Sequence, residues 1–68
     1  MKINKEDVIK GLSSMFDNEI ETISFLKKSL VNYKGRDNMI SQVNDNIEMA
    51  DERATILDNA ITLIRGES

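Results

Sequence analysis

Apolar residues in the second half of the chain recur at alternating spacings of three and four positions. These residues are Ile40, Val43, Ile47, Ala50, Ala54, Leu57, Ile61 and Ile64. Because an α-helix has about 3.6 residues per turn, this spacing places all of them on one side of a helix. Such a heptad ladder is typical of a helix that packs along its whole length against another helix.

The first half of the chain carries a matching ladder with the same spacing. Its members are Ile9, Leu12, Phe16, Glu19, Ile23, Leu26, Leu30 and Tyr33. A reversal of the chain near Gly35 would set Tyr33 across from Ile40. Apolar side chains would then meet in every layer except the one that contains Glu19. The sequence therefore predicts an all-α fold, a long antiparallel two-helix hairpin.

Capping residues predict where the two helices begin and end. Asn4 can cap the first helix by accepting a hydrogen bond from the backbone N–H of Asp7. Gly35 and Gly66 each follow a cation and suit the left-handed position after a helix, and Asp37 can open the second helix. The predicted single domain, residues 1–68, contains a helix over about 5–34, a turn at about 35–37 and a helix over about 38–65.

The size and composition of the chain predict that hairpins associate. The chain has 68 residues and contains no cysteine and no histidine. Domains of this size rarely bury enough apolar area to be stable without disulfides, a metal or association. Disulfides and thiolate zinc sites are excluded here, and the commonest metal ligand is missing. We therefore expect a homo-oligomer, with a dimer that forms a four-helix bundle favoured over a higher helical oligomer.

Apolar residues outside the two ladders indicate where this association takes place. Val8, Met15 and Ile20 widen the apolar side of the first helix. On the second helix a stripe recurs every seven residues. The candidate oligomer interface consists of Val8, Met15, Ile20, Met49, Ile56, Ala60 and Leu63. A contact with a different protein is the alternative use of the second-helix stripe.

Glu19 interrupts the first ladder at its centre. A carboxylate in this position needs a partner, and Arg53, next to Ala54 on the facing ladder, can reach it within the hairpin or from a second chain. Three roles for Glu19 are open. It can fix register and oligomeric state, as polar residues do in coiled coils. It can hold a ligand together with Arg53 in a hydrated crevice, or lie exposed at an end or gap of the bundle.

Further candidate contact residues lie away from the ladders. Phe25 faces away from the seam and is a candidate anchor for a partner protein. Four cations gather around the turn and could contact phosphate groups: Lys27, Lys28, Lys34 and Arg36. The net charge of −3 and the lack of a glycine-rich loop disfavour nucleic acid as the partner. Acidic residues follow one another along the second helix at Asp45, Glu48, Asp51, Glu52 and Asp58.

These features indicate a noncatalytic protein that uses no cofactor and no metal, since no serine has a histidine base to activate it. We expect a small regulatory protein, of inhibitor, adaptor or chaperone type, that binds another protein through an oligomeric helical bundle. One alternative is an oligomeric binder, or sponge, of a small anionic ligand such as a nucleotide. Another is a dimeric hairpin regulator that binds RNA or DNA. The composition also favours a cytoplasmic protein without membrane contact, encoded by a bacterial, plasmid or phage genome.

Overall fold

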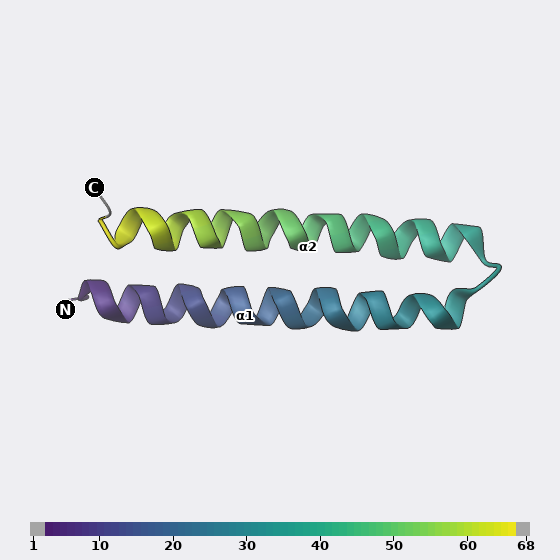
Figure 1. Cartoon of the computed structure of the whole chain (residues 1–68), viewed down its shortest axis with the longest axis horizontal. Helices are drawn as coiled ribbons and strands as arrows, with labels where there is room; N and C mark the ends of the chain where they lie inside the picture. Colours follow the sequence, from purple (N-terminus) through teal and green to yellow (C-terminus); the bar gives the residue numbers. More distant parts are fainter. Residues whose placement is uncertain (1–2, 67–68) are drawn as a thin grey trace.

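The computed structural model describes residues 3–66 and is an antiparallel helical hairpin (Figure 1). Helix α1 spans Lys5–Ser29, a short 3-10 helix, η1, spans Leu30–Tyr33, and helix α2 spans Asp37–Ile64. The two long helices lie side by side in a rod of 51 × 21 × 17 Å, and the described residues form no strand. The predicted all-α hairpin is therefore confirmed. The ends of the predicted domain, residues 1–2 and 67–68, lie outside the described part.

Helix α1 begins as its capping residues predict. The side-chain oxygen of Asn4 accepts a hydrogen bond from the backbone N–H of Asp7 at 2.9 Å. Glu6 and Asp7 occupy the first turn, where the helix dipole favours negative charge. Next to this turn, Lys5 Nζ donates to the backbone carbonyl of Arg65 at 3.0 Å. The start of α1 is thereby tied to the end of α2.

The end of the first helix differs from the prediction, because α1 stops at Ser29 rather than near residue 34. The N–H of Leu30 bonds to the carbonyl of Lys27, three residues back, and Ser29 Oγ donates to the carbonyl of Leu26 at 2.7 Å. This shorter spacing tightens the winding into η1. The 3-10 helix rises about 2.0 Å per residue instead of about 1.5 Å. It carries the chain to the turn while η1 still packs against α2.

The connection between the helices is a tight turn. The carbonyl of Tyr33 accepts a hydrogen bond from the N–H of Arg36 at 2.8 Å. Lys34 has φ −55° and ψ 126°, and Gly35 has φ +83°, which match the two central residues of a type II turn. The left-handed conformation predicted for Gly35 is therefore confirmed, and it follows the cap of η1 rather than that of α1. Asp37 is already helical, and Arg36 precedes α2 without a side-chain cap.

Replacing Gly35 with alanine is expected to destabilise the hairpin by about 1 kcal/mol, because a Cβ atom disfavours positive φ. Urea unfolding followed by helical circular dichroism would measure the change. Gly35→Asn should lose less, since asparagine tolerates this conformation better. Lys34→Ala, at an ordinary φ, serves as the control. Equal midpoints for the alanine variant and the wild type would contradict the type II turn.

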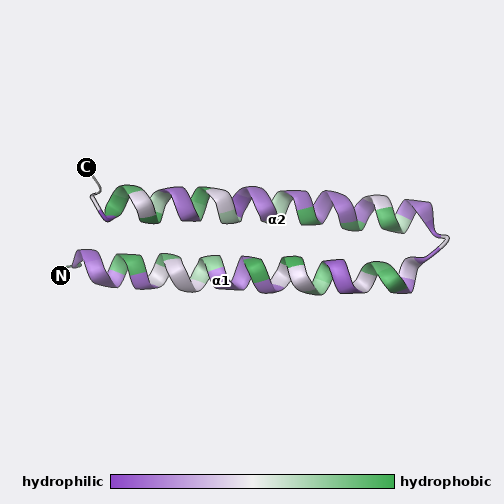
Figure 2. Ribbon diagram, in the orientation of Figure 1, coloured by the Kyte–Doolittle hydropathy of each residue, from purple (hydrophilic) through white to green (hydrophobic). Residues whose placement is uncertain are grey.

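The seam between α1 and α2 follows the predicted ladders. The buried residues are Val43, Ala50, Ala54 and Ile61, all members of the α2 ladder. The remaining ladder positions of both helices are half-buried, Glu19 included. Apolar bands recur along both helices between polar ones (Figure 2). The sequence therefore predicted correctly which side of each helix faces the other.

The hairpin leaves much of its surface in water. No residue of α1 is buried. The accessible surface is 5536 Å² for a chain of 7.7 kDa, whereas a compact monomer of this mass exposes about 4,300 Å². The excess of about 1,200 Å² arises because each helix covers only one side of the other. The flanks of the seam therefore decide what the hairpin can bind.

Candidate functional site

Glu19 and Arg53 form an ion pair across the seam. Arg53 Nε donates to Glu19 Oε2 at 3.1 Å, and Arg53 Nη2 lies 3.1 Å from Glu19 Oε1. Two parallel contacts of this kind fix both the position and the plane of the guanidinium group. The structure thus places the pair within one hairpin, which is one of the two arrangements expected from the sequence.

The two partners of this ion pair are unequally covered. The side chain of Glu19 is 22% exposed and that of Arg53 is 51% exposed. Glu19 Oε1 is buried and accepts no hydrogen bond, although it is close to Nη2. Arg53 has five N–H donors, more than a single carboxylate can use. The pair therefore retains a buried acceptor and several donors that the hairpin does not use.

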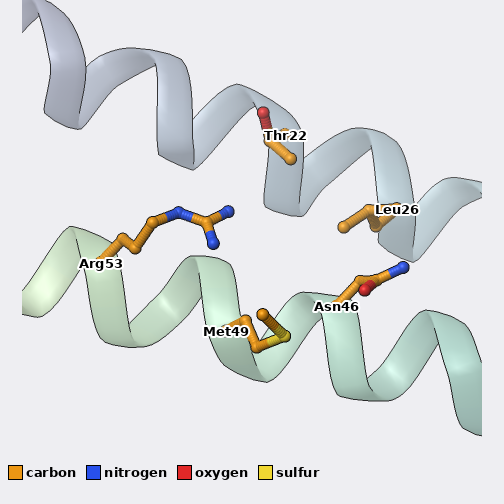
Figure 3. Close-up of a pocket in the computed structure, with 5 residues that line it drawn as sticks. All are labelled: Thr22, Leu26, Asn46, Met49 and Arg53. Atoms are coloured by element: carbon orange, nitrogen blue, oxygen red, sulfur yellow. The ribbon is translucent and has the colours of Figure 1, made fainter.

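Arg53 divides a groove that runs between the helices. A hollow of about 240 Å³ on one side is lined by Thr22, Leu26, Asn46, Met49 and Arg53 (Figure 3). A hollow of about 180 Å³ on the other side is lined by Met15, Glu19, Arg53, Ile56 and Leu57. Figure 3 shows the Arg53 side chain reaching from α2 toward α1. Since the lining residues follow one another in three- and four-residue steps on each helix, both hollows open on one flank of the seam.

Apart from the seam residues Glu19, Leu26 and Leu57, these lining residues belong to a second ladder on each helix, which we call the neutral face. On α1 the neutral face comprises Val8, Gly11, Met15, Asn18, Thr22, Phe25, Ser29 and Asn32. On α2 it comprises Met39, Gln42, Asn46, Met49, Arg53, Ile56, Ala60 and Leu63. Arg53 is the only charged residue among them, and Glu19 already neutralises it. This flank of the hairpin is thus almost free of net charge.

The opposite flank of the seam, the charged face, has the reverse character. On α1 its charged residues are Glu6, Lys10, Asp17, Lys27 and Lys34. On α2 they are Asp37, Glu48, Asp51, Asp58 and Arg65. All of these side chains are exposed. The uneven distribution of charge distinguishes the two flanks more clearly than the positions of the apolar residues do.

The neutral face unites most of the predicted interface residues and exposes the larger ones. Exposure rises from 54% for Met15 to 79% for Leu63, whereas Val8 and Ala60 are half-buried. Ile20 does not belong to this surface. It lies five residues from Met15, about 140° around α1, and is on the charged face. The predicted interface is therefore divided between the two flanks.

Phe25 lies on the neutral face, although the sequence analysis treated it as a separate contact. It is three residues beyond Thr22, only about 60° around the helix, on the side away from the seam. It is 70% exposed. Met49, which is 55% exposed, lines the hollow beside Thr22. Phe25 and the α2 stripe thus form one surface.

The predicted basic tip is present, and its four cations lie near the turn. Lys27 and Lys28 lie in the last turn of α1, where cations offset the helix dipole. Lys34 lies in the turn and Arg36 directly precedes α2. All four side chains are exposed, and within residues 3–66 the one ion pair is that of Arg53 with Glu19. The cations therefore share one end of the rod, and their charges face solvent.

Comparison of the chain with the models of known protein families, with curated proteins and with solved structures finds no match. Neither α1 nor α2 combines the length and the apolar character that crossing a membrane requires. Within the described range, no three acidic side chains are grouped so that they could hold a metal ion. The functional interpretation therefore depends on the chemistry of the two flanks.

Proposed function

We propose that this chain is a small noncatalytic interaction protein that assembles through its neutral face into a helical bundle and acts by binding another protein. The observation that carries the proposal is the gathering of exposed apolar side chains on a flank whose single charge is already paired. Contiguous apolar surface of this kind marks a site of protein association. Interface cores are likewise depleted of charge and enriched in aromatic residues and methionine.

The state of the cations supports a protein partner over an anionic ligand. Arg53 is the cation that lines both hollows, and Glu19 already neutralises its charge, so a free anion meets no net positive charge there. A carboxylate already held at two points is a strong competitor. The lysines of the tip are separate and exposed, which gives an anion little to bind cooperatively. A protein partner that binds through apolar contacts does not compete with Glu19 for Arg53.

Association through the neutral face leaves the charged face outside. Ile20 and Val31 are exposed there, at 45% and 77%, among lysines and acidic residues. These two apolar side chains can form the centre of an interface, and the charged residues around them its rim. We expect such an interface to be weaker and more easily exchanged than the one on the neutral face. We assign the contact with a different protein to this outer surface.

A matched pair of variants tests the proposal. Ile56→Glu places a charge on the neutral face, and Ile20→Glu places the same charge on the charged face. We expect the wild type and Ile20→Glu to sediment above the mass of one chain, and Ile56→Glu to sediment as a single chain with unchanged helical circular dichroism. Native mass spectrometry of each protein from its own host would report any bound partner. If both variants retained the wild-type mass, or if the wild type were a bare single chain, the proposal would be wrong.

A further inference from the structure

We infer that the occupant of the neutral face is a second copy of this chain, packed face to face with both turns at the same end, so that Glu19 and Arg53 of the two copies form one ring of alternating charge. This inference rests on the proposed function and specifies the partner and its orientation. It uses two features of the hairpin, which are the N–H donors of the half-exposed Arg53 that Glu19 does not use and the neutral flank.

The neutral face is large enough for a stable dimer. The rod measures 51 Å along its helices and 21 Å across them. A standard specific interface buries about 800 Å² on each partner, which is less than this face offers. The surface that the hairpin exposes beyond a compact monomer, about 1,200 Å², is also of the size that an interface must cover.

The ion pair determines the orientation of the second copy. With both turns at the same end, α1 of each copy lies against α2 of the other, antiparallel and at the same level as in the hairpin. Glu19 then has Arg53 of its own chain on one side and Arg53 of the second copy on the other. The second Arg53 brings another positive charge to the Glu19 carboxylate from the neutral face. Oε1 itself is covered by its own hairpin, so the attraction acts between the two charged groups without contact at that atom. Each charge is flanked by opposite charges.

The reverse orientation, with the turns at opposite ends, is unfavourable. In that case α1 packs on α1 of the second copy. A two-fold axis at the level of Glu19 sets two carboxylates against each other, which is a like-charge contact in a covered layer. An axis elsewhere covers each ion pair with uncharged residues of another layer, which removes its water without supplying an opposite charge. Charge complementarity therefore selects the arrangement with both turns at one end.

The apolar positions of the neutral face match in the same arrangement. The neutral-face residues of α1 run against the neutral-face residues of α2 in the second copy. This pairs Val8 with Leu63 and Met15 with Ile56. Gly11 meets Ala60, so small residues also face each other. In the hairpin, a Cβ atom built on Gly11 meets no atom within 4 Å, which leaves room for a second helix. At the exposed rim, Lys28 comes level with Asp45, which is an attractive pair. Glu21 comes level with Glu52, a like-charge pair whose repulsion is screened by solvent.

Charge reversal tests the ring. The Glu19→Arg chain has two arginines in this layer and the Arg53→Glu chain has two glutamates, so each alone should sediment as a single chain. Mixing them should restore a heterodimer, because only contacts between copies then join opposite charges. Asp51→Lys, on the charged face, is the control and should leave the wild-type mass unchanged. A mixture that stays monomeric, from chains with helical circular dichroism, would overturn the ring.

Disulfide trapping tests the orientation with the ion pair intact, and the chain contains no cysteine of its own. A Met15→Cys chain and an Ile56→Cys chain, one carrying a mass tag, are mixed and oxidised. We expect the mixed disulfide to exceed either self-disulfide, because disulfides require Cα atoms within about 7 Å. The inference would be overturned if the Ile56→Cys self-disulfide predominated, or if no disulfide formed at all. If the trapping result failed but the native mass exceeded that of one chain, the proposed function would still stand. If the protein were a bare single chain, both the inference and the proposed function would be wrong.

Discussion

Replacing Ala54 with leucine is expected to destabilise the hairpin by about 1–3 kcal/mol, because the added carbon atoms enter a packed site and must displace their neighbours. Ala54 is 4% exposed and belongs to the seam ladder that faces Glu19. Urea unfolding followed by helical circular dichroism, at matched protein concentrations, measures the loss. The volume-conserving change Leu57→Met, three residues further along the same ladder, should lose less. Equal midpoints for the two variants would contradict the close approach of the helices at Ala54.

Glu19→Leu should have the opposite sign and stabilise the hairpin by about 1–2 kcal/mol. The leucine would complete the apolar ladder, and exchanging a partly buried ion pair for apolar packing is often neutral or favourable. Arg53 loses its partner at little cost, because its side chain is already 51% exposed and can hydrate. Unfolding in urea at low concentration, where one chain is observed alone, gives the relevant free energy.

Arg53→Met is the companion change, and it should destabilise the hairpin. It leaves Glu19, whose side chain is only 22% exposed, without its cation. The double variant Glu19→Leu, Arg53→Met should be at least as stable as Glu19→Leu, since neither charge remains. If Glu19→Leu were destabilising, the carboxylate would not occupy the seam position that the structure gives it.

The seam was predictable because the spacing of the apolar residues defines it. Ile40 to Ile64 and Ile9 to Tyr33 repeat with the period of a helix, and each repeat needs a covered side. The end of α1 was not predictable in the same way. Whether a backbone N–H bonds three or four residues back depends on small differences in geometry, and Ser29 Oγ adds its own bond to the carbonyl of Leu26.

The neutral face was only partly predictable, for a different reason. The seven-residue stripe of Met49, Ile56 and Leu63 is apolar and therefore visible. Phe25 has only polar residues three and four positions away, and its flank depends on where the seam lies. Ile20 lies on the other flank from the rest of the predicted interface, because hydrophobicity alone does not distinguish the two sides of a seam. The informative signal was the lack of charge at three- and four-residue steps. That signal can be read from the sequence once the seam is known.

The hairpin topology gives the molecule two chemically different ends. Residues 3 and 66 lie together at one end, and the type II turn closes the other (Figure 1). The exposed cations of the turn region occupy the closed end, while the acidic residues of α2 follow the shaft. In the proposed dimer both closed ends coincide, so the positive charge there doubles. The assembly would then be an axially polarised rod, which approaches a charged surface preferentially with one end.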